Sequence, residues 1–171
     1  ARLLEHATTS PRLSARLVLP RQLSFHDSDA AWPRGLPGVH ERLAAPVSRY
    51  LRAAIPDPGA LFHTSYYRLP RRRVSRYIVT AYDFTYERYR HGLARLVHTR
   101  QKLASLRHAD AVLCISHSTK RDVLEFCKGM DPARLHVTHL GVETGTFFPD
   151  ACAIADHETT VLFVGQRTGY K

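Results

Sequence analysis

The chain has 171 residues, of which 44% are hydrophobic and 23% are charged. This balance is typical of a globular domain and excludes a disordered or fibrous chain. The apolar runs extend for only a few residues, far short of the roughly 20 that a membrane-spanning helix needs. The formal net charge is +10, and one short segment is crowded with arginines: Arg68, Arg71, Arg72, Arg73 and Arg76. Such a cluster attracts phosphates, anionic lipid or nucleic acid without choosing among them.

The first residues and the three cysteines predict where the chain begins and in which compartment it lies. Residues 1–6 have neither an initiator Met nor a signal-peptide pattern and are typical of the last turns of a helix, so we expect the chain to be truncated there. Cys114, Cys127 and Cys152 match neither an even disulfide framework nor a paired metal-ligand spacing. This usage of cysteine predicts a reducing, cytoplasmic location.

Short apolar runs alternate with helical patterns along the chain. The predicted strands are 16–19, 60–63, 77–81, 111–115, 135–139 and 161–164. The predicted helices are 40–55, 87–108 and 119–128, and the second has an apolar stripe of Leu93, Leu96, Val97, Leu103 and Leu106. Nearly all-apolar strands separated by helices predict an α/β fold, a Rossmann-like doubly wound parallel sheet covered on both faces. In such sheets ligands bind at the carboxyl ends of the strands.

A polar stretch near the end of the chain predicts a domain boundary. Residues 1–148 are predicted to form the Rossmann-like domain, 149–160 a linker, and 161–171 the first strand and turn of a second domain. Because one strand cannot form a domain alone, we expect the chain to be truncated at its end as well.

Polar residues follow three of the predicted strands. Tyr82 and Asp83 come after 77–81, and the Asp83 carboxylate suits either a base that orients a hydroxyl or the cap of the next helix. Ser116 and Thr119 come after 111–115 and are typical helix N-caps, although free amides at a helix start also suit an anion. His63 ends the strand 60–63, where a structural hydrogen-bonding histidine is the commoner interpretation.

The last eleven residues place a buried strand directly before a glycine-containing turn. Gly165 permits a close approach of the backbone, and Arg167 and Lys171 stand four residues apart. Backbone amides, a guanidinium and an ammonium in this order can meet a diphosphate. An ordinary turn between strand and helix, with charges facing solvent, also explains the pattern.

Four segments together resemble family four of the glycosyltransferases, a retaining group with the GT-B fold. Residues 77–84 (YIVTAYDF) resemble the family's strand ending in His-Asp, and 109–122 resemble its segment that begins Ala-Asp and continues through Ser to Asp. Residues 137–149, with the Gly141-Val142 pair and Phe-Pro, resemble its exit from the first domain. Residues 161–171 (VLFVGQRTGYK) resemble the opening of its donor domain.

The resemblance implies roles for individual residues. The first domain would hold the acceptor, with Ser116, Thr119, His63 and Arg68 binding substrate and with Asp83 and Tyr82 as the catalytic pair. Tyr82 stands where many members carry His, so the histidine role is not carried over. The second domain would hold the nucleotide sugar, its diphosphate bound by Arg167, Lys171 and Gly165, with Gly141 at the cleft. These cations replace a metal ion, and neither a metal nor another cofactor is expected.

The expected partners are a UDP-, GDP- or ADP-linked sugar and a saccharide or lipid-linked acceptor in cell-envelope polysaccharide synthesis. Arginines 71–76 suit contact with the anionic inner face of a membrane. We expect residues 1–171 alone not to transfer sugar.

The alternatives are a nucleotide-sugar epimerase or a phosphorylase of the same fold, or a basic nucleic-acid-binding module. No nucleic-acid motif is visible. The strand ends instead gather aromatic rings on which sugars can stack: Tyr66, Tyr67, Tyr82, Phe84 and Tyr86.

Overall fold

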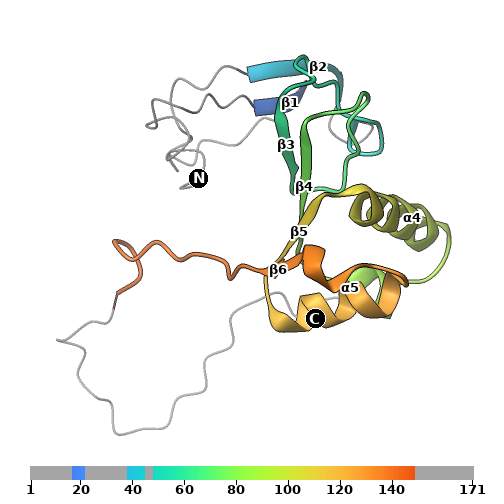
Figure 1. The fold of residues 1–171 in the computed structure, drawn as a ribbon, viewed down its shortest axis with the longest axis vertical. Helices are drawn as coiled ribbons and strands as arrows, with labels where there is room; N and C mark the ends of the chain where they lie inside the picture. The colour runs from blue at the N-terminus through green and yellow to red at the C-terminus, as the bar shows by residue number, and fades with distance from the viewer. Residues whose placement is uncertain (1–16, 22–37, 45–47, 149–171) are drawn as a thin grey trace, which may run out of the picture.

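The structure is a computed structural model that describes residues 17–21, 38–44 and 48–148, with side chains from residue 48 onward (Figure 1). Its centre is a four-stranded, all-parallel sheet in the order β3-β4-β5-β6. The strands are β3 Leu61–Thr64, β4 Arg76–Ala81, β5 Ala111–Cys114 and β6 Leu135–Val137. These confirm the predicted strands at 60–63, 77–81, 111–115 and 135–139 to within a few residues, and they confirm the parallel sheet.

Helices make the connections between the last three strands. α3 Thr85–Tyr89 and α4 Leu93–His108 lead from β4 to β5, and α5 His117–Phe126 with the short 3-10 helix η1 Pro132–Arg134 leads from β5 to β6. In Figure 1 both α4 and α5 lie to the right of the sheet. The described chain is thus an α/β fold compatible with a Rossmann-like arrangement. The doubly wound form, in which helices cover both faces of the sheet, remains a prediction.

The face of the sheet toward the helices forms the core. Tyr77, Val79 and Ala81 of β4 are buried and alternate with half-buried Ile78 and Thr80. Because the strands are in parallel register, Val112 and Cys114 of β5 and Leu135 of β6 fall on the same buried face. Leu106 of α4 and Val123 of α5 pack against them. The opposite face is less well covered, and Leu61 on it is 59% exposed.

The predicted helix at 40–55 is wrong. Residues Gly38–Ala44 form strand β2, which pairs in parallel with β1 Leu17–Arg21 as a separate two-stranded sheet. Pro46 interrupts the helical pattern in the sequence, and the part described from residue 48 to 55 is mostly turn and irregular structure. Pairing with a distant strand overrides the local helix propensity here.

The predicted helix at 87–108 is divided into α3 and α4. Gly92 has a φ of 81°, a left-handed conformation that glycine adopts without steric cost, and α4 begins directly after it. The apolar stripe is correct only in its second half, because Leu103 and Leu106 join the core whereas Leu93, Leu96 and Val97 are exposed.

A buried ion pair joins the two helices. Lys102 of α4 and Glu87 of α3 each have side chains only 1% exposed, and Lys102 Nζ lies 2.8 Å from Glu87 Oε2. Lys102 Nζ also donates to the Asp83 carbonyl at 2.8 Å, and Thr99 Oγ1 donates to Glu87 Oε1 at 3.0 Å. The Lys102 charge lies over the rings of Phe84 and Tyr67, at 4.5 and 5.2 Å from their centroids. Every charge in this cluster therefore has hydrogen-bonding partners, which makes its burial tolerable.

Opposing effects set the ionisation of Glu87. Burial disfavours its charged form, but His98 and Lys102 outweigh burial and lower the pKa of Glu87 to about 2. The His98 Nδ1 atom lies 3.9 Å from Glu87 Oε1, beyond hydrogen-bond length, so we attribute the lower pKa chiefly to the ammonium of Lys102.

Replacement of Lys102 by Met should leave the Glu87 carboxylate buried without its cation. We expect the free energy of unfolding, measured by urea denaturation, to fall by about 3–5 kcal/mol. Arg88→Met is the matched control, because Arg88 is half exposed and pairs with Asp122 and Glu125 at the surface. Its loss should be about 1 kcal/mol or less. If the free energy of unfolding falls equally in the two variants, the buried ion pair stabilises the fold no more than the surface pair does.

The Glu87 pair should also give an acid-dependent stability. Because the folded pKa of about 2 lies below the ordinary value of 4.5, the carboxylate stabilises the fold above pH 4.5 and loses this contribution as the pH falls toward 2. The difference in unfolding free energy between wild type and Glu87→Gln should be constant above about pH 5 and shrink below it. Urea denaturation at a series of pH values measures this, and a constant difference down to pH 3 contradicts the assignment.

Candidate functional site

The carboxyl edge of the sheet is built around the backbone of Tyr82, the residue that follows β4. The Tyr82 N–H donates to the Tyr67 hydroxyl at 3.3 Å, and the Tyr82 carbonyl accepts from Thr119 Oγ1 at 3.0 Å. Tyr67 is buried, and burial raises its pKa. The main chain of Tyr82 is therefore fixed from both sides, while the residue as a whole remains 37% exposed at the edge.

Asp83 makes a local contact in the turn that leads into α3. Its Oδ1 accepts a hydrogen bond of 2.9 Å from the N–H of Thr85, the first residue of α3, and its side chain is at the surface. The N-cap of α3 is Phe84, which has no side-chain cap hydrogen bond, so Asp83 closes a local turn just before the helix and is not its cap. A carboxylate held by one oxygen still offers the other to a ligand hydroxyl.

Ser116 and Thr119 form the start of α5. Ser116 Oγ accepts from the Thr119 N–H at 3.0 Å and lies 3.0 Å from Thr119 Oγ1, so Ser116 is the N-cap and the helix begins at His117 rather than at the predicted 119. Thr119 is buried, and its hydroxyl donates to Tyr82. Thr119 is therefore a positioning residue that fixes the Tyr82 turn, whereas half-buried Ser116 lies nearer the surface.

Two histidines that the sequence analysis did not select also lie at this edge. His117 follows β5 and His139 follows β6, and their ring centroids are 6.1 Å apart. His139 Nδ1 lies 3.2 Å from the Ile115 carbonyl. Because a carbonyl only accepts, Nδ1 carries the hydrogen and Nε2 of the neutral ring is an acceptor. The signal that could have found them was their place at strand ends, since His117 comes soon after the predicted strand 111–115 and His139 is the last residue of the predicted strand 135–139.

The remaining predicted site residues lie at other places. His63 is within β3 on the less covered face, where its Nε2 lies 2.8 Å from Thr80 Oγ1 and partial burial lowers its pKa. This is the structural hydrogen bond that was the commoner interpretation. Arg68 Nε donates to the Leu51 carbonyl at 3.0 Å, in the segment before β3. Gly141 is exposed, with open space where a Cβ would stand.

Only part of the predicted aromatic surface is accessible. Tyr82 and Tyr86 are each 37% exposed, and Tyr66 is half-buried with the Arg49 guanidinium 4.7 Å from its ring centroid. Tyr67 and Phe84 are core residues, and Phe84 stacks on Phe126 at 5.2 Å. The expectation that sugars stack on all five rings is therefore wrong for Tyr67 and Phe84, because both rings are buried against other side chains of the core.

The predicted donor-side residues Gly165, Arg167 and Lys171 lie outside the described residues, as do the linker 149–160 and the strand 161–164. Among the residues that the structure describes, no helix is long and apolar enough to cross a bilayer. Nor do three or more His, Cys, Asp or Glu side chains in that part come together as metal ligands. Cys114 and Cys127 are free and buried, and burial raises the pKa of both thiols.

The arrangement at the carboxyl edge suits a ligand rich in hydroxyl groups. It combines a phenol, a carboxylate, a serine hydroxyl and two imidazoles, which can donate to and accept from such a ligand. Surface hollows in the described part lie elsewhere, one of about 250 Å³ on α4 and one of about 390 Å³ at the amino edge of the sheet. No model of a known protein family matches the chain, and no curated protein matches it either.

Removal of the α5 cap should weaken the edge. Ser116→Ala deletes the acceptor of the Thr119 N–H, and we expect the free energy of unfolding to fall by about 1 kcal/mol in urea denaturation. Ser118→Ala is the matched control, since Ser118 is exposed in the same turn and is not the cap. A change of similar size in both variants would mean that the capping bond has no net effect.

Proposed function

We propose that this chain belongs to a retaining GT-B-type glycosyltransferase that transfers a sugar from a nucleotide sugar to a saccharide or lipid-linked acceptor. The observation that carries the proposal is the order of the four family-like segments in the sequence. Three of them fall on β4, on β5 with α5, and on the stretch after β6. Their polar ends share one edge of a parallel sheet, which is the edge where ligands bind in such folds.

The acceptor would lie at the carboxyl edge. The exposed Tyr82 hydroxyl donates a hydrogen bond to a sugar hydroxyl, and the Asp83 carboxylate accepts one from the reacting hydroxyl. Ser116 and His139 add further polar contacts beside them. Thr119 acts through the backbone of Tyr82, so we assign it to positioning rather than to substrate contact.

The donor would be held by residues at the end of the chain. Arg167 and Lys171 bind its diphosphate and stabilise the charge of the leaving group, and Gly165 lets the backbone approach the phosphates. Binding residues on two separate domains would bring the acceptor hydroxyl and the sugar together in the cleft between them.

The test is release of nucleoside diphosphate by the full-length protein, offered UDP-, GDP- and ADP-sugars in turn together with candidate acceptors. We expect release from one donor and a loss of roughly 100-fold in kcat/KM in Arg167→Ala, because a cation that meets the leaving group's charge is removed. Arg100→Ala, an exposed arginine on α4, is the control and should keep the activity.

A folded protein that releases no nucleoside diphosphate from any donor in the panel would contradict the proposal. Equal losses in Arg167→Ala and Arg100→Ala would contradict the role given to Arg167.

A further inference from the structure

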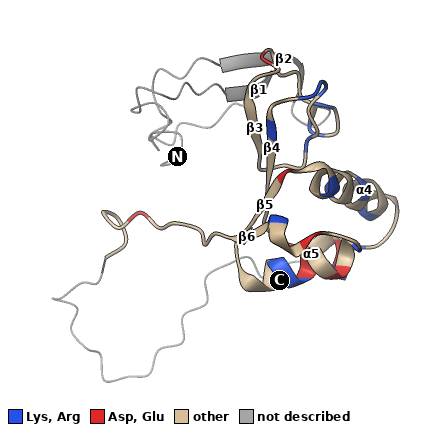
Figure 2. Cartoon of the chain, in the orientation of Figure 1, with Lys and Arg blue, Asp and Glu red and all other residues tan. Residues whose placement is uncertain are grey.

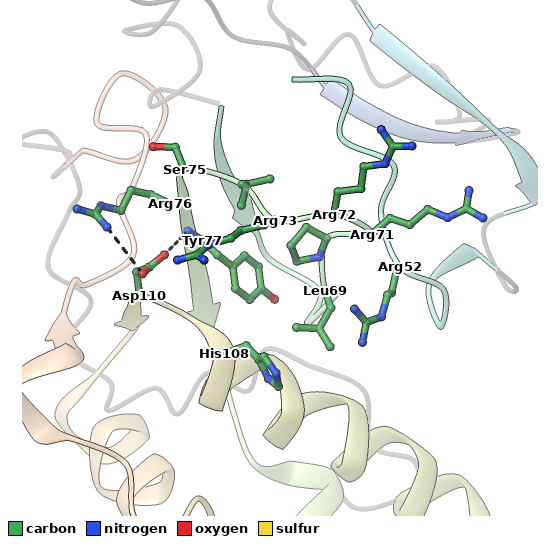
Figure 3. Close-up of a pocket in the computed structure, with 12 residues that line it drawn as sticks. Arg52, Leu69, Arg71, Arg72, Arg73, Ser75, Arg76, Tyr77, His108 and Asp110 are labelled. Carbon is green, nitrogen blue, oxygen red and sulfur yellow. Dashed lines mark hydrogen bonds and ion pairs between the residues drawn. The ribbon is translucent and has the colours of Figure 1, made fainter. Parts of the chain in front are cut away.

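A cationic pocket lies at the amino edge of the sheet, opposite the candidate acceptor site. Its volume is about 390 Å³, and it lies between the loop that leads into β4 and the end of α4 (Figure 3). Its basic lining residues are Arg52, Arg71, Arg72, Arg73, Arg76 and His108. Figure 2 shows the blue of Lys and Arg on the loop beside β3 and β4.

Among the residues with described side chains, 48–148, the positive charge of the pocket is largely unbalanced. Asp110 is the acidic residue in its lining, and the Asp110 carboxylate is already engaged, with Oδ2 accepting from the Tyr77 N–H at 2.7 Å and Oδ1 4.0 Å from Arg76. No Asp or Glu between residues 48 and 148 forms an ion pair with any of the other four arginines. A pocket with this surplus of charge favours an anion.

The loop that carries the arginines is held in place by the backbone. The Ala53 N–H donates to the Leu69 carbonyl and the Arg71 N–H donates to the Ala53 carbonyl, both at 2.8 Å, and the Ser75 N–H donates to the Ala60 carbonyl at 3.1 Å. Ala53 itself is buried. Arginines on a fixed loop lose less conformational entropy when they bind a ligand than arginines on a free tail.

Two apolar residues of the same loop pack against the core. Leu69 and Val74 are half-buried against the core, while the three arginines between them are exposed. The Tyr77 hydroxyl donates to the Arg68 carbonyl at 2.9 Å and lies 2.5 Å from Ser105 Oγ, and burial raises the pKa of Tyr77 to about 12. The apolar anchors flank three consecutive arginines, which keeps these arginines at the surface, where they line the pocket.

We propose that this amino-edge pocket binds the phosphate groups of an anionic ligand through Arg71, Arg72 and Arg73. A guanidinium presents its N–H groups as a planar fork that matches two phosphate oxygens, and the bonds formed are charge-assisted. The phosphate can belong to a soluble phosphate ester or to a lipid headgroup. The proposal does not depend on the proposed transferase, because the pocket and the carboxyl-edge residues lie at opposite ends of the strands.

The test measures binding of pyrophosphate to the full chain by isothermal titration calorimetry at about 0.1 M ionic strength, where the Debye length is about 10 Å. The variant R71S/R72S/R73S should bind at least about tenfold more weakly than wild type, the loss expected for one charge-assisted hydrogen bond. The matched control is R100S/R121S/K128S, which removes the same charge from exposed positions on or next to α4 and α5, outside the pocket. It should bind within about twofold of wild type, since charges beyond a Debye length are screened.

A second arm distinguishes the source of the phosphate. Sedimentation with phosphatidylcholine vesicles, with and without phosphatidylglycerol, is measured for the same three proteins. Pyrophosphate binding that only the pocket variant loses supports the proposal with a soluble ligand. Binding only to the phosphatidylglycerol vesicles, again lost only in the pocket variant, supports it with a lipid ligand. Equal weakening in both triple variants, or no binding of either probe by wild type, overturns it.

A charge-preserving variant keeps the test valid if the serine variant does not fold. R71K/R72K/R73K retains three positive charges and lacks the guanidinium fork. We expect it to bind severalfold more weakly than wild type, with an unchanged midpoint of thermal unfolding. Affinity equal to that of wild type would overturn recognition by the guanidinium groups.

Discussion

The buried ammonium of Lys102 is the point on which the carboxyl edge of the sheet depends. A lysine has three hydrogens to donate, and here two of them meet the Glu87 carboxylate and the Asp83 carbonyl, each at 2.8 Å. The carbonyl of Asp83 belongs to the same turn as the Tyr82 ring and the Asp83 carboxylate. A charge in the core therefore sets the position of a turn at the surface. The cost of burying this charge explains why all its partners are close and why α3, α4 and the turn after β4 form one unit.

The parallel sheet separates two kinds of surface that are adjacent in the sequence. The chain leaves β3 at Thr64, at the carboxyl edge, and must return to the amino edge before β4 can begin at Arg76. One short crossover therefore carries Tyr66 at its beginning and Arg71 to Arg73 near its end. The arginine cluster looked like one site in the sequence, yet Arg68 binds the Leu51 carbonyl and is not in the pocket lining, whereas Arg71, Arg72, Arg73 and Arg76 line the amino-edge pocket.

The strands could be predicted because a buried parallel strand has a simple sequence pattern, a short apolar run bounded by polar or turn residues. Residues 77–81 and 111–115 show this pattern, and both became strands. The segment Gly38–Ala44 has no such pattern, since it contains His, Glu and Arg and is a strand only through its pairing with β1. The division at Gly92 depends on a φ value that the residue type permits but does not require. Strand β2 and the division of the helix at Gly92 therefore could not be predicted, because one depends on pairing with a distant strand and the other on a backbone conformation that glycine merely permits.

The same distinction applies to the candidate site. Some of its residues could be predicted from their position in the sequence, whereas the roles of others depend on how the side chains pack. Position after a strand was enough to bring Tyr82, Asp83 and Ser116 to one edge, because strand direction fixes where each turn emerges. It could not reveal that Thr119 is buried beneath that edge, or that Lys102, on a helix surface in the sequence pattern, is its internal support. The local bond to the Thr85 N–H does not remove Asp83 from function. It fixes the side chain's orientation, and a carboxylate with one oxygen bound to its own helix is better oriented for a ligand than one that rotates in solvent.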